Sequence, residues 1–476
     1  MGRMGGTGRT RFVALILAVW VAGLGAQDAN EAATARRLAS IRGNPLALEA
    51  FLREMPKGGD LHNHTSGAIY AESYFRWAAE DGTCMTVATF TFVAAPCDAS
   101  AGRPAVSAVM ADATLYNQAI DALSMRNWPA GLNGHDHFFA AFGKFGAVSS
   151  AHGGDMVAEL SSRAAAEHVS YLELMLTPYT AAVGRGAGWT GDFAQMRAKL
   201  LASAGWNDIF TQSKQRLDAI DARRNTAQKC GMPAADPGCA VIVRYVSQVA
   251  RAAPPEEVFA QILAGFDVAA HDPRVVGINL VQPEDAPVAV RDFTLQMKMI
   301  DYLRQFYPRV HVTLHAGEIV DGLVPPDVLR FHIRESVDVA HAERIGHGVD
   351  VMSEDNPPLL LREMAAKKVL VEINLSSNDQ ILGVKGNRHP LRTYLQYGVP
   401  VAISTDDYGV ARSSHTLEFL KAVQEHNLDY ATLKRMVRNS IEYAFVDAAT
   451  KAKLKQDLEA SFRRFEQREA DAAPRQ

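Results

Sequence analysis

"VIVRYVSQVARAAPPEEVFAQILAGFDVAAHDPRVVGINLV", residues 241–281, has the pattern of one strand, one helix and a second strand. The runs VIVRYVSQ from Val241 and VVGINLV from Val275 are short and apolar, whereas the stretch between them has helical spacing. Parallel strands need such a crossover, which is usually a helix. The stretch therefore predicts a β–α–β unit whose sheet is covered on both faces.

The same alternation extends over most of the chain. Six further runs have strand character: GGDL before His62, VSYLELML from Val169, VHVTLHA from Val310, ERIGHG from Glu343, VLVEINL from Val369 and VPVAIST from Val399. Eight strands separated by helices predict an α/β fold of the (β/α)8 TIM barrel type. A doubly wound open sheet is the alternative.

The ends of the chain predict segments outside the barrel. Three arginines precede the apolar run FVALILAVWVAGL, and small residues follow it, so residues 1–26 are expected to be a cleaved signal peptide and the protein to be secreted or periplasmic. A membrane anchor or a buried helix is the alternative. Residues 27–56 are expected to form a helical extension, through which a homodimer could form. The barrel is expected over 57–465, with an insertion at about 83–134 and a flexible charged tail at 466–476.

Composition limits the class of protein. Of the 476 residues, 48% are hydrophobic and 21% are charged, which is typical of a soluble globular protein. The net charge of −4, without a long basic run, argues against nucleic acid as a partner. After removal of the signal peptide, no contact with a membrane is expected.

Four cysteines occur as two close pairs. Cys84 and Cys97 form one pair and Cys230 and Cys239 the other, each around an irregular stretch. Together with an export signal, this favours two local disulfides. Four cysteines allow three connectivities, however, and metal binding is a rival interpretation, although neither spacing is C-x-x-C.

Polar residues with metal and proton chemistry follow the predicted strands. In a strand, His62 and His64 point to the same side, although two polar residues on a solvated loop would be the simpler interpretation. The strand ends also carry His315 with Glu318, His347, and the pair Asp406 and Asp407. Catalytic groups of such barrels lie at these ends. Three imidazoles and one carboxylate suit zinc with an open position for water, which predicts hydrolytic attack on an electrophilic carbon.

The stretches MPKGGDLHNHTSG, LHAGE, RIGHG and STDD, in this order between Met55 and Arg412, resemble the adenosine deaminase family of metal-dependent amidohydrolases. The secreted, growth-factor-type branch is the most similar. The resemblance implies one zinc per chain, bound by His62, His64, His315 and Asp406. It also implies that Glu318 shares a proton with the purine N1, that His347 holds the hydroxide, that Asp407 contacts N7, and that adenosine becomes inosine and ammonia.

The chain departs from the family pattern at the expected substrate contacts. Ser66 lies where an acidic residue often contacts the ribose, and Gln282 takes the place of a glycine whose backbone meets the base. Tyr408 replaces the usual proline. Adenosine is the expected purine nucleoside, with deoxyadenosine, a modified adenosine or another aminopurine as alternatives. A phosphoesterase-type metallohydrolase and an inactive nucleoside-binding or signalling protein are the other classes.

Six further histidines are expected to have no catalytic role. Surface or capping positions are predicted for His135, His137 and His152, and solvated helix positions for His332 and His341. A structural role is predicted for His389.

Overall fold

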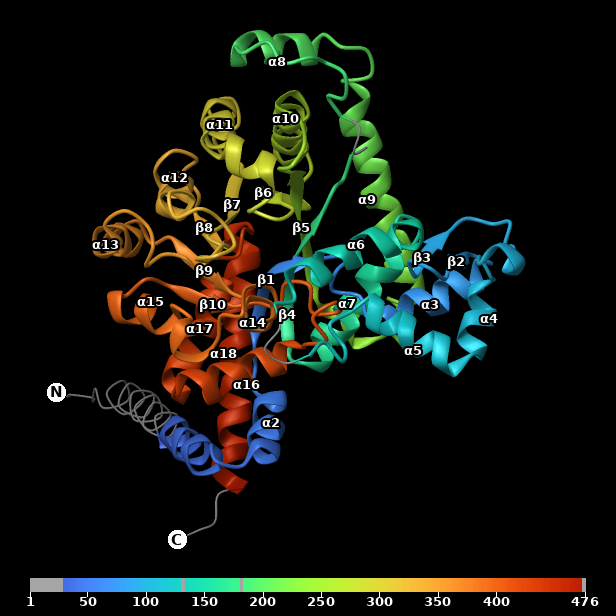
Figure 1. Cartoon of the computed structure of the whole chain (residues 1–476). Helices are drawn as coiled ribbons and strands as arrows, with labels where there is room; N and C mark the ends of the chain where they lie inside the picture. Colours follow the sequence, from blue (N-terminus) through green and yellow to red (C-terminus); the bar gives the residue numbers. More distant parts are fainter. Residues whose placement is uncertain (1–28, 130–132, 180–182, 473–476) are drawn as a thin grey trace, which may run out of the picture.

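Eight parallel strands form a nearly closed barrel in the computed structural model, which describes residues 29–129, 133–179 and 183–472 (Figure 1). The strands are β1 (Gly58–His64), β4 (Val169–Leu176), β5 (Ile242–Ala250), β6 (Val275–Val281), β7 (His311–Ala316), β8 (Arg344–His347), β9 (Leu370–Ile373) and β10 (Val401–Ile403), hydrogen-bonded in this order. The amide of Asp406, after β10, donates to the carbonyl of His62 in β1 at 2.8 Å. This contact closes the sheet, so the predicted TIM barrel is confirmed over the open-sheet alternative.

Helices surround the barrel because its strands are apolar on both faces. They are α7 (Gly153–Ala166), α9 (Asp208–Ala227), α10 (Pro255–His271), α11 (Pro287–Arg304), α12 (His332–Asp338), α13 (Pro357–Lys367), α14 (Leu375–Leu382), α15 (Leu391–Tyr397), α16 (His415–His426) and α17 (Tyr430–Glu442), with α8 (Phe193–Leu201) further out. Phe259, Ile262 and Phe266 of α10 are fully buried, since this helix packs between the strands and the neighbouring helices.

A long segment separates β1 from β4. It contains α3 (Ala71–Glu80), the hairpin of β2 (Cys84–Thr86) and β3 (Thr91–Val93), α4 (Val106–Ala111), α5 (Ala113–Ala122) and α6 (His135–Ser149). Both local cysteine pairs are disulfides: Cys84–Cys97 joins the first residue of β2 to the stretch after β3, and Cys230–Cys239 lies between α9 and β5.

The N-terminal and C-terminal helices pack on each other (Figure 1). Residues 29–41 and α2 (Pro45–Glu54) are helical, and the ring of Phe51 lies 5.1 Å from that of Phe465 in α18 (Ala448–Ala472). Of the tail predicted to be flexible from residue 466, the residues as far as Ala472 are helical and continue α18. A homodimer through the N-terminal extension stays a prediction.

The predicted signal peptide, residues 1–26, lies outside the described residues. Within the described part of the chain, no helix is both long enough and apolar enough to cross a membrane.

Candidate active site

Four side chains from three strand ends place their ligand atoms around one point. The Nε2 atom of His315 lies 3.1 Å from that of His62 and 3.1 Å from that of His64. Asp406 Oδ1 lies 3.5 Å from His62 Nε2 and 3.3 Å from His64 Nε2. Ligands about 2.05 Å from a tetrahedral zinc ion are about 3.3 Å apart, so the donor set fits that ion in type and in spacing.

Neighbouring acceptors orient the imidazoles toward this point. Glu372 Oε2, from β9, lies 2.7 Å from His62 Nδ1, and Asn279 Oδ1, from β6, lies 2.9 Å from His315 Nδ1. Because a carboxylate or amide oxygen only accepts, each Nδ1 donates and each Nε2 is left with a lone pair for a metal. Both acceptors were missed in the sequence, although Glu372 is the single acidic residue within the apolar run VLVEINL.

The electrostatics of the ligand cluster also favour a cation. Burial lowers the pKa of His64 to about 4 and that of His315 well below its usual range, so both are neutral, as metal ligands must be. Burial also disfavours the charged form of His62, but hydrogen bonds with Asp406 and Glu372 outweigh it and raise the pKa of His62 to about 10. The two carboxylates thus stabilise a positive charge at the His62 imidazole. A bound metal ion would supply this charge in place of a proton.

Glu318 lies beside this cluster without belonging to the four-ligand set. Its Oε1 is 3.4 Å from His347 Nδ1, and the side chain is 7% exposed. Burial, together with the charges of Asp406 and Glu284, raises the pKa of Glu318 well above its usual range. Glu318 therefore holds a proton under conditions in which an exposed glutamate has lost it.

A chain of hydrogen bonds fixes the tautomer of His347. His389 Nε2 lies 3.1 Å from Asn378 Oδ1, which turns the amide so that Asn378 Nδ2 faces His347 Nδ1 at 3.0 Å. Burial lowers the pKa of His347 to about 3, so its ring is neutral and the proton is on Nε2. His389 is buried, in agreement with the predicted structural role.

Asp407 is packed tightly at the wall of the site. A Cβ at Gly67 would lie 1.6 Å from Asp407 Oδ1, so only glycine leaves room for this carboxyl group. Burial and the adjacent Asp406 raise the pKa of Asp407 well above its usual range, which favours its protonated form.

A cavity of about 400 Å³ opens above these residues, large enough for a small ligand. Ser66 and Gln282, the predicted substrate contacts, both line it, and Phe138, Phe139 and Phe142 of α6 form an aromatic wall. Gln282 has a φ of 83°, the backbone conformation that suits the glycine it replaces, and its Oε1 accepts from the amide of Ala252 at 3.0 Å. Among the lining residues that the structure describes, none is lysine or arginine.

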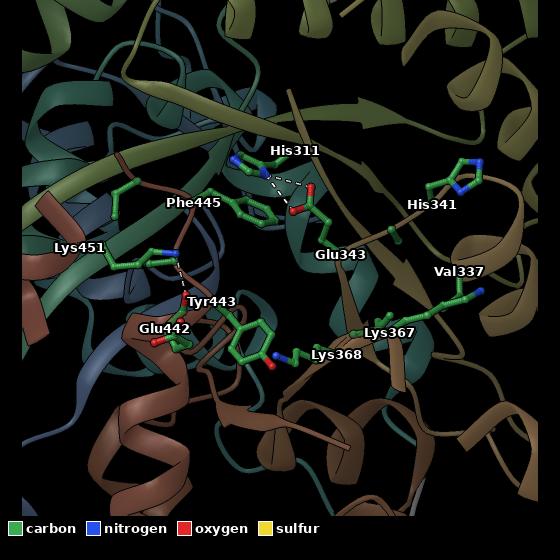
Figure 2. Close-up of a pocket in the computed structure, with 14 residues that line it drawn as sticks. His311, Val337, His341, Glu343, Lys367, Lys368, Glu442, Tyr443, Phe445 and Lys451 are labelled. Atoms are coloured by element: carbon green, nitrogen blue, oxygen red, sulfur yellow. Dashed lines mark hydrogen bonds and ion pairs between the residues drawn. The ribbon is translucent and has the colours of Figure 1, made fainter. Parts of the chain in front are cut away.

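A second cavity, of about 390 Å³, lies at the opposite end of the barrel (Figure 2). It is lined by His311 at the start of β7 and by Glu343, Lys368, Tyr443 and Phe445, and His311 Nδ1 is 2.9 Å from Glu343 Oε1. The metal-ligand groups found in the described residues are not among its lining residues, so the site at the carboxyl ends of the strands is the candidate active site.

The prediction that His332 is solvated is wrong. Its ring is fully buried and stacks on Phe293 with 3.8 Å between the centroids, and Nδ1 lies 2.5 Å from Glu284 Oε1. Helical spacing gave no sign that this face of α12 meets an acid from the loop after β6.

Comparisons with known proteins agree with the fold and identify the family. The family model for adenosine deaminase matches residues 154–461. An adenosine deaminase of Clostridium perfringens is 32% identical over 145 residues, which are 30% of this chain and 40% of that protein, so this chain spans less than half the length of that curated relative.

Solved structures share the fold at low identity. An Arabidopsis N6-mAMP deaminase is 18% identical with a TM-score of 0.59, covering 86% of this chain and 99% of that one. A Burkholderia ambifaria amidohydrolase with bound Zn is also 18% identical, with a TM-score of 0.53, covering 89% of this chain and 95% of that one. Since the family model matches well over half of the chain, the protein belongs to the adenosine deaminase family.

Proposed function

We propose that the protein is a zinc-dependent hydrolase that deaminates adenosine, and also deoxyadenosine, to inosine and ammonia. The observation that carries this proposal is the buried carboxyl group of Glu318, which lies beside a four-ligand metal cluster at the base of the pocket and whose pKa is raised by burial. A purine whose N1 accepts a proton becomes more electrophilic at C6, and the hydrolytic replacement of the C6 amino group follows from attack there.

Zinc is supported by the donor set and by the solved amidohydrolase with bound Zn. A zinc ion bound by His62, His64, His315 and Asp406 would supply a Lewis acid that lowers the pKa of water to about 7. The proton transfers and hydrogen bonds of the reaction are provided by side chains of the pocket.

Each of three side chains acts on a different atom. Glu318 donates its proton to N1 of the base, which increases the positive character of C6. The Nε2–H of His347 has no hydrogen-bond partner among the described residues and can donate to the attacking oxygen. Asp407 in its protonated form can donate to N7, an acceptor of the purine ring. Together these donors distinguish a purine from a substrate without ring nitrogens.

The lining of the pocket favours a neutral nucleoside over a nucleotide. The described lining residues include the carboxylate of Asp406 but no lysine or arginine to bind a phosphate. The nucleotide named for the Arabidopsis deaminase is therefore not expected to be the substrate here, even though the fold is shared.

A substrate panel tests this proposal. Purified protein loaded with zinc should release ammonia from adenosine and deoxyadenosine, with the loss of absorbance near 265 nm as a second readout. Adenine and AMP should give kcat/KM values at least about 100-fold lower, a difference of about 2.7 kcal/mol in transition-state stabilisation. A preference for AMP or for adenine would contradict the assignment of substrate, and the absence of turnover with all four would leave the binding or signalling class.

We also propose that the protein acts outside the cytoplasm. The apolar segment after three N-terminal arginines and the two disulfides support this proposal, because disulfides persist in oxidising compartments. N-terminal sequencing of the protein from the culture medium or periplasm should begin near residue 27. A chain that retains residues 1–26 in the cytoplasm would contradict it.

A further inference from the structure

Two buried charged residues form hydrogen bonds with the backbone of the segment that carries His315 and Glu318. Arg251, just after β5, donates from Nη2 to the carbonyl of His315 at 2.7 Å. Glu284, in the loop after β6, accepts from the amide of Gly317 at 3.0 Å and from that of Glu318 at 2.9 Å. Arg251 is fully buried and Glu284 is 2% exposed. We refer to Arg251 and Glu284 as the backbone clamp.

The backbone clamp determines the position of the Glu318 backbone, from which the side chain extends. The chain turns sharply at Gly317, which has a φ of 76°, and a Cβ there would lie 2.4 Å from Asp350 Oδ1. The turn is therefore packed on one side and hydrogen-bonded to Glu284 on the other. Buried amides need acceptors, and here one carboxylate serves two consecutive N–H groups.

The two clamp residues are themselves held in place. Arg251 donates its amide to the carbonyl of Val281 at 3.1 Å, and the side chain of Gln282 accepts from the amide of Ala252 at 3.0 Å, which joins the ends of β5 and β6. Gln282 thus has a role in the scaffold that a glycine could not fill.

Charge balance keeps Glu284 an acceptor. Burial alone would favour its neutral form, but His332 Nδ1 at 2.5 Å and Arg251 Nη1 at 3.8 Å outweigh burial and lower the pKa of Glu284 to about 2. As a carboxylate, Glu284 accepts on both oxygens and cannot be replaced by a group that also donates.

We propose that Glu284 is a positioning residue for the reaction: it holds the backbone of Glu318, and with it the proton, at the correct distance from the base. This inference rests on the proposed function of Glu318 as proton donor. Among the described residues, no other acceptor is found for the amides of Gly317 and Glu318. Misplacement of a catalytic group by about 1 Å can lower the rate by about 100-fold.

The substitution Glu284→Gln tests the role with little change of shape. The amide NH2 must face either the Gly317 N–H and His332 Nδ1, or the Glu318 N–H and Arg251, so a donor meets a donor in both orientations. We expect kcat for adenosine to fall by about 100-fold, KM to change by less than about threefold, and zinc content to stay at one per chain.

A double-mutant cycle with Glu318→Ala distinguishes positioning from general damage. If Glu284 acts through the side chain of Glu318, then Glu284→Gln should lower kcat by less than about threefold in the Glu318→Ala background. An equal loss of kcat in both backgrounds, or a wild-type kcat in the single variant, would overturn the proposal. If Glu318→Ala itself retains wild-type kcat, the proposed function of Glu318 fails, which is a separate and distinguishable outcome.

Two further variants guard against a folding defect. Glu167 also accepts from two consecutive backbone amides, those of His415 at 3.1 Å and Thr416 at 3.0 Å, but outside the pocket; Glu167→Gln should keep the wild-type kcat. If Glu284→Gln does not fold, Glu284→Asp supports the same cycle, because a shorter carboxylate keeps the charge and loses reach. It should lower kcat only when Glu318 is present, and an equal effect without Glu318 would overturn the proposal.

Discussion

Replacing Glu372 with glutamine should weaken zinc binding. The Glu372 carboxylate is fully buried, accepts from His62 Nδ1 at 2.7 Å and from Thr313 Oγ1 at 2.9 Å, and forms an ion pair with Arg344, whose Nε lies 2.7 Å away. The amide loses the charge that makes His62 a strong ligand and that holds its ring in orientation. Loss of such a partner typically lowers metal affinity by about 10- to 100-fold, or about 1.4–2.7 kcal/mol.

The same substitution should also destabilise the protein without zinc. Breaking a buried ion pair typically costs about 3–5 kcal/mol, but Arg344 keeps its second carboxylate partner, Glu173, so we expect about 3 kcal/mol or less. The glutamine can still accept from Thr313, which reduces the loss further.

Glu466→Gln is the matched control. Glu466 is also fully buried and pairs with Lys434 at 2.5 Å while accepting from Tyr430, but it lies on α18, away from the metal cluster. Competition with a zinc chelator and guanidinium unfolding of the zinc-free proteins measure the two quantities separately. Both variants should lose stability, and only Glu372→Gln should lose affinity. Equal zinc affinity in the two variants would refute the role of Glu372.

Three further predictions concern stability, pH and the sugar. Replacing Cys84 and Cys97 with alanine, which opens a loop with a sequence separation of 13, should lower the free energy of unfolding by about 3 kcal/mol in a denaturant titration. Burial raises the pKa of Glu418 to about 7 from 4.5, so its stabilising contribution is complete below about pH 4.5 and is lost as the pH rises through 7. Unfolding at pH 5 and pH 7.5 should therefore show a stability loss on raising the pH that Glu418→Gln reduces. With Ser66 in place of a carboxylate at the sugar, deoxyadenosine should have a kcat/KM within about tenfold of that of adenosine, and a preference above a thousandfold would mean that another residue binds the ribose.

The barrel and the cluster of reactive side chains could be predicted because both are encoded locally. All eight strands were predicted from short apolar runs, since parallel strands buried on both faces leave a continuous pattern. His62 and His64 were predicted to converge because alternate residues of a strand share a side. The disulfide Cys84–Cys97 could be predicted from the close spacing of its cysteines.

The supporting residues could not be predicted because their partners are distant in sequence. Glu372 contacts His62, which lies 310 residues away, and no local pattern connects them. His332 and Glu284 are 48 residues apart and meet only when α12 packs beside the loop after β6. The charged composition of the tail gave no sign that residues 466–472 continue the long helix α18, whose preceding turn is anchored by the buried Phe462 and Phe465.

The most direct test of the central claim compares the wild-type protein with Glu318→Gln, with adenosine as substrate and ammonia and inosine as the measured products. The wild-type protein should form both in equal amounts. The variant, which keeps all four metal ligands, should contain the same zinc and lose at least about 100-fold in kcat, because general acid catalysis typically contributes about 10²–10⁴-fold. Failure of the zinc-loaded wild-type protein to release ammonia, or a variant that keeps more than about a tenth of wild-type kcat, would contradict the account.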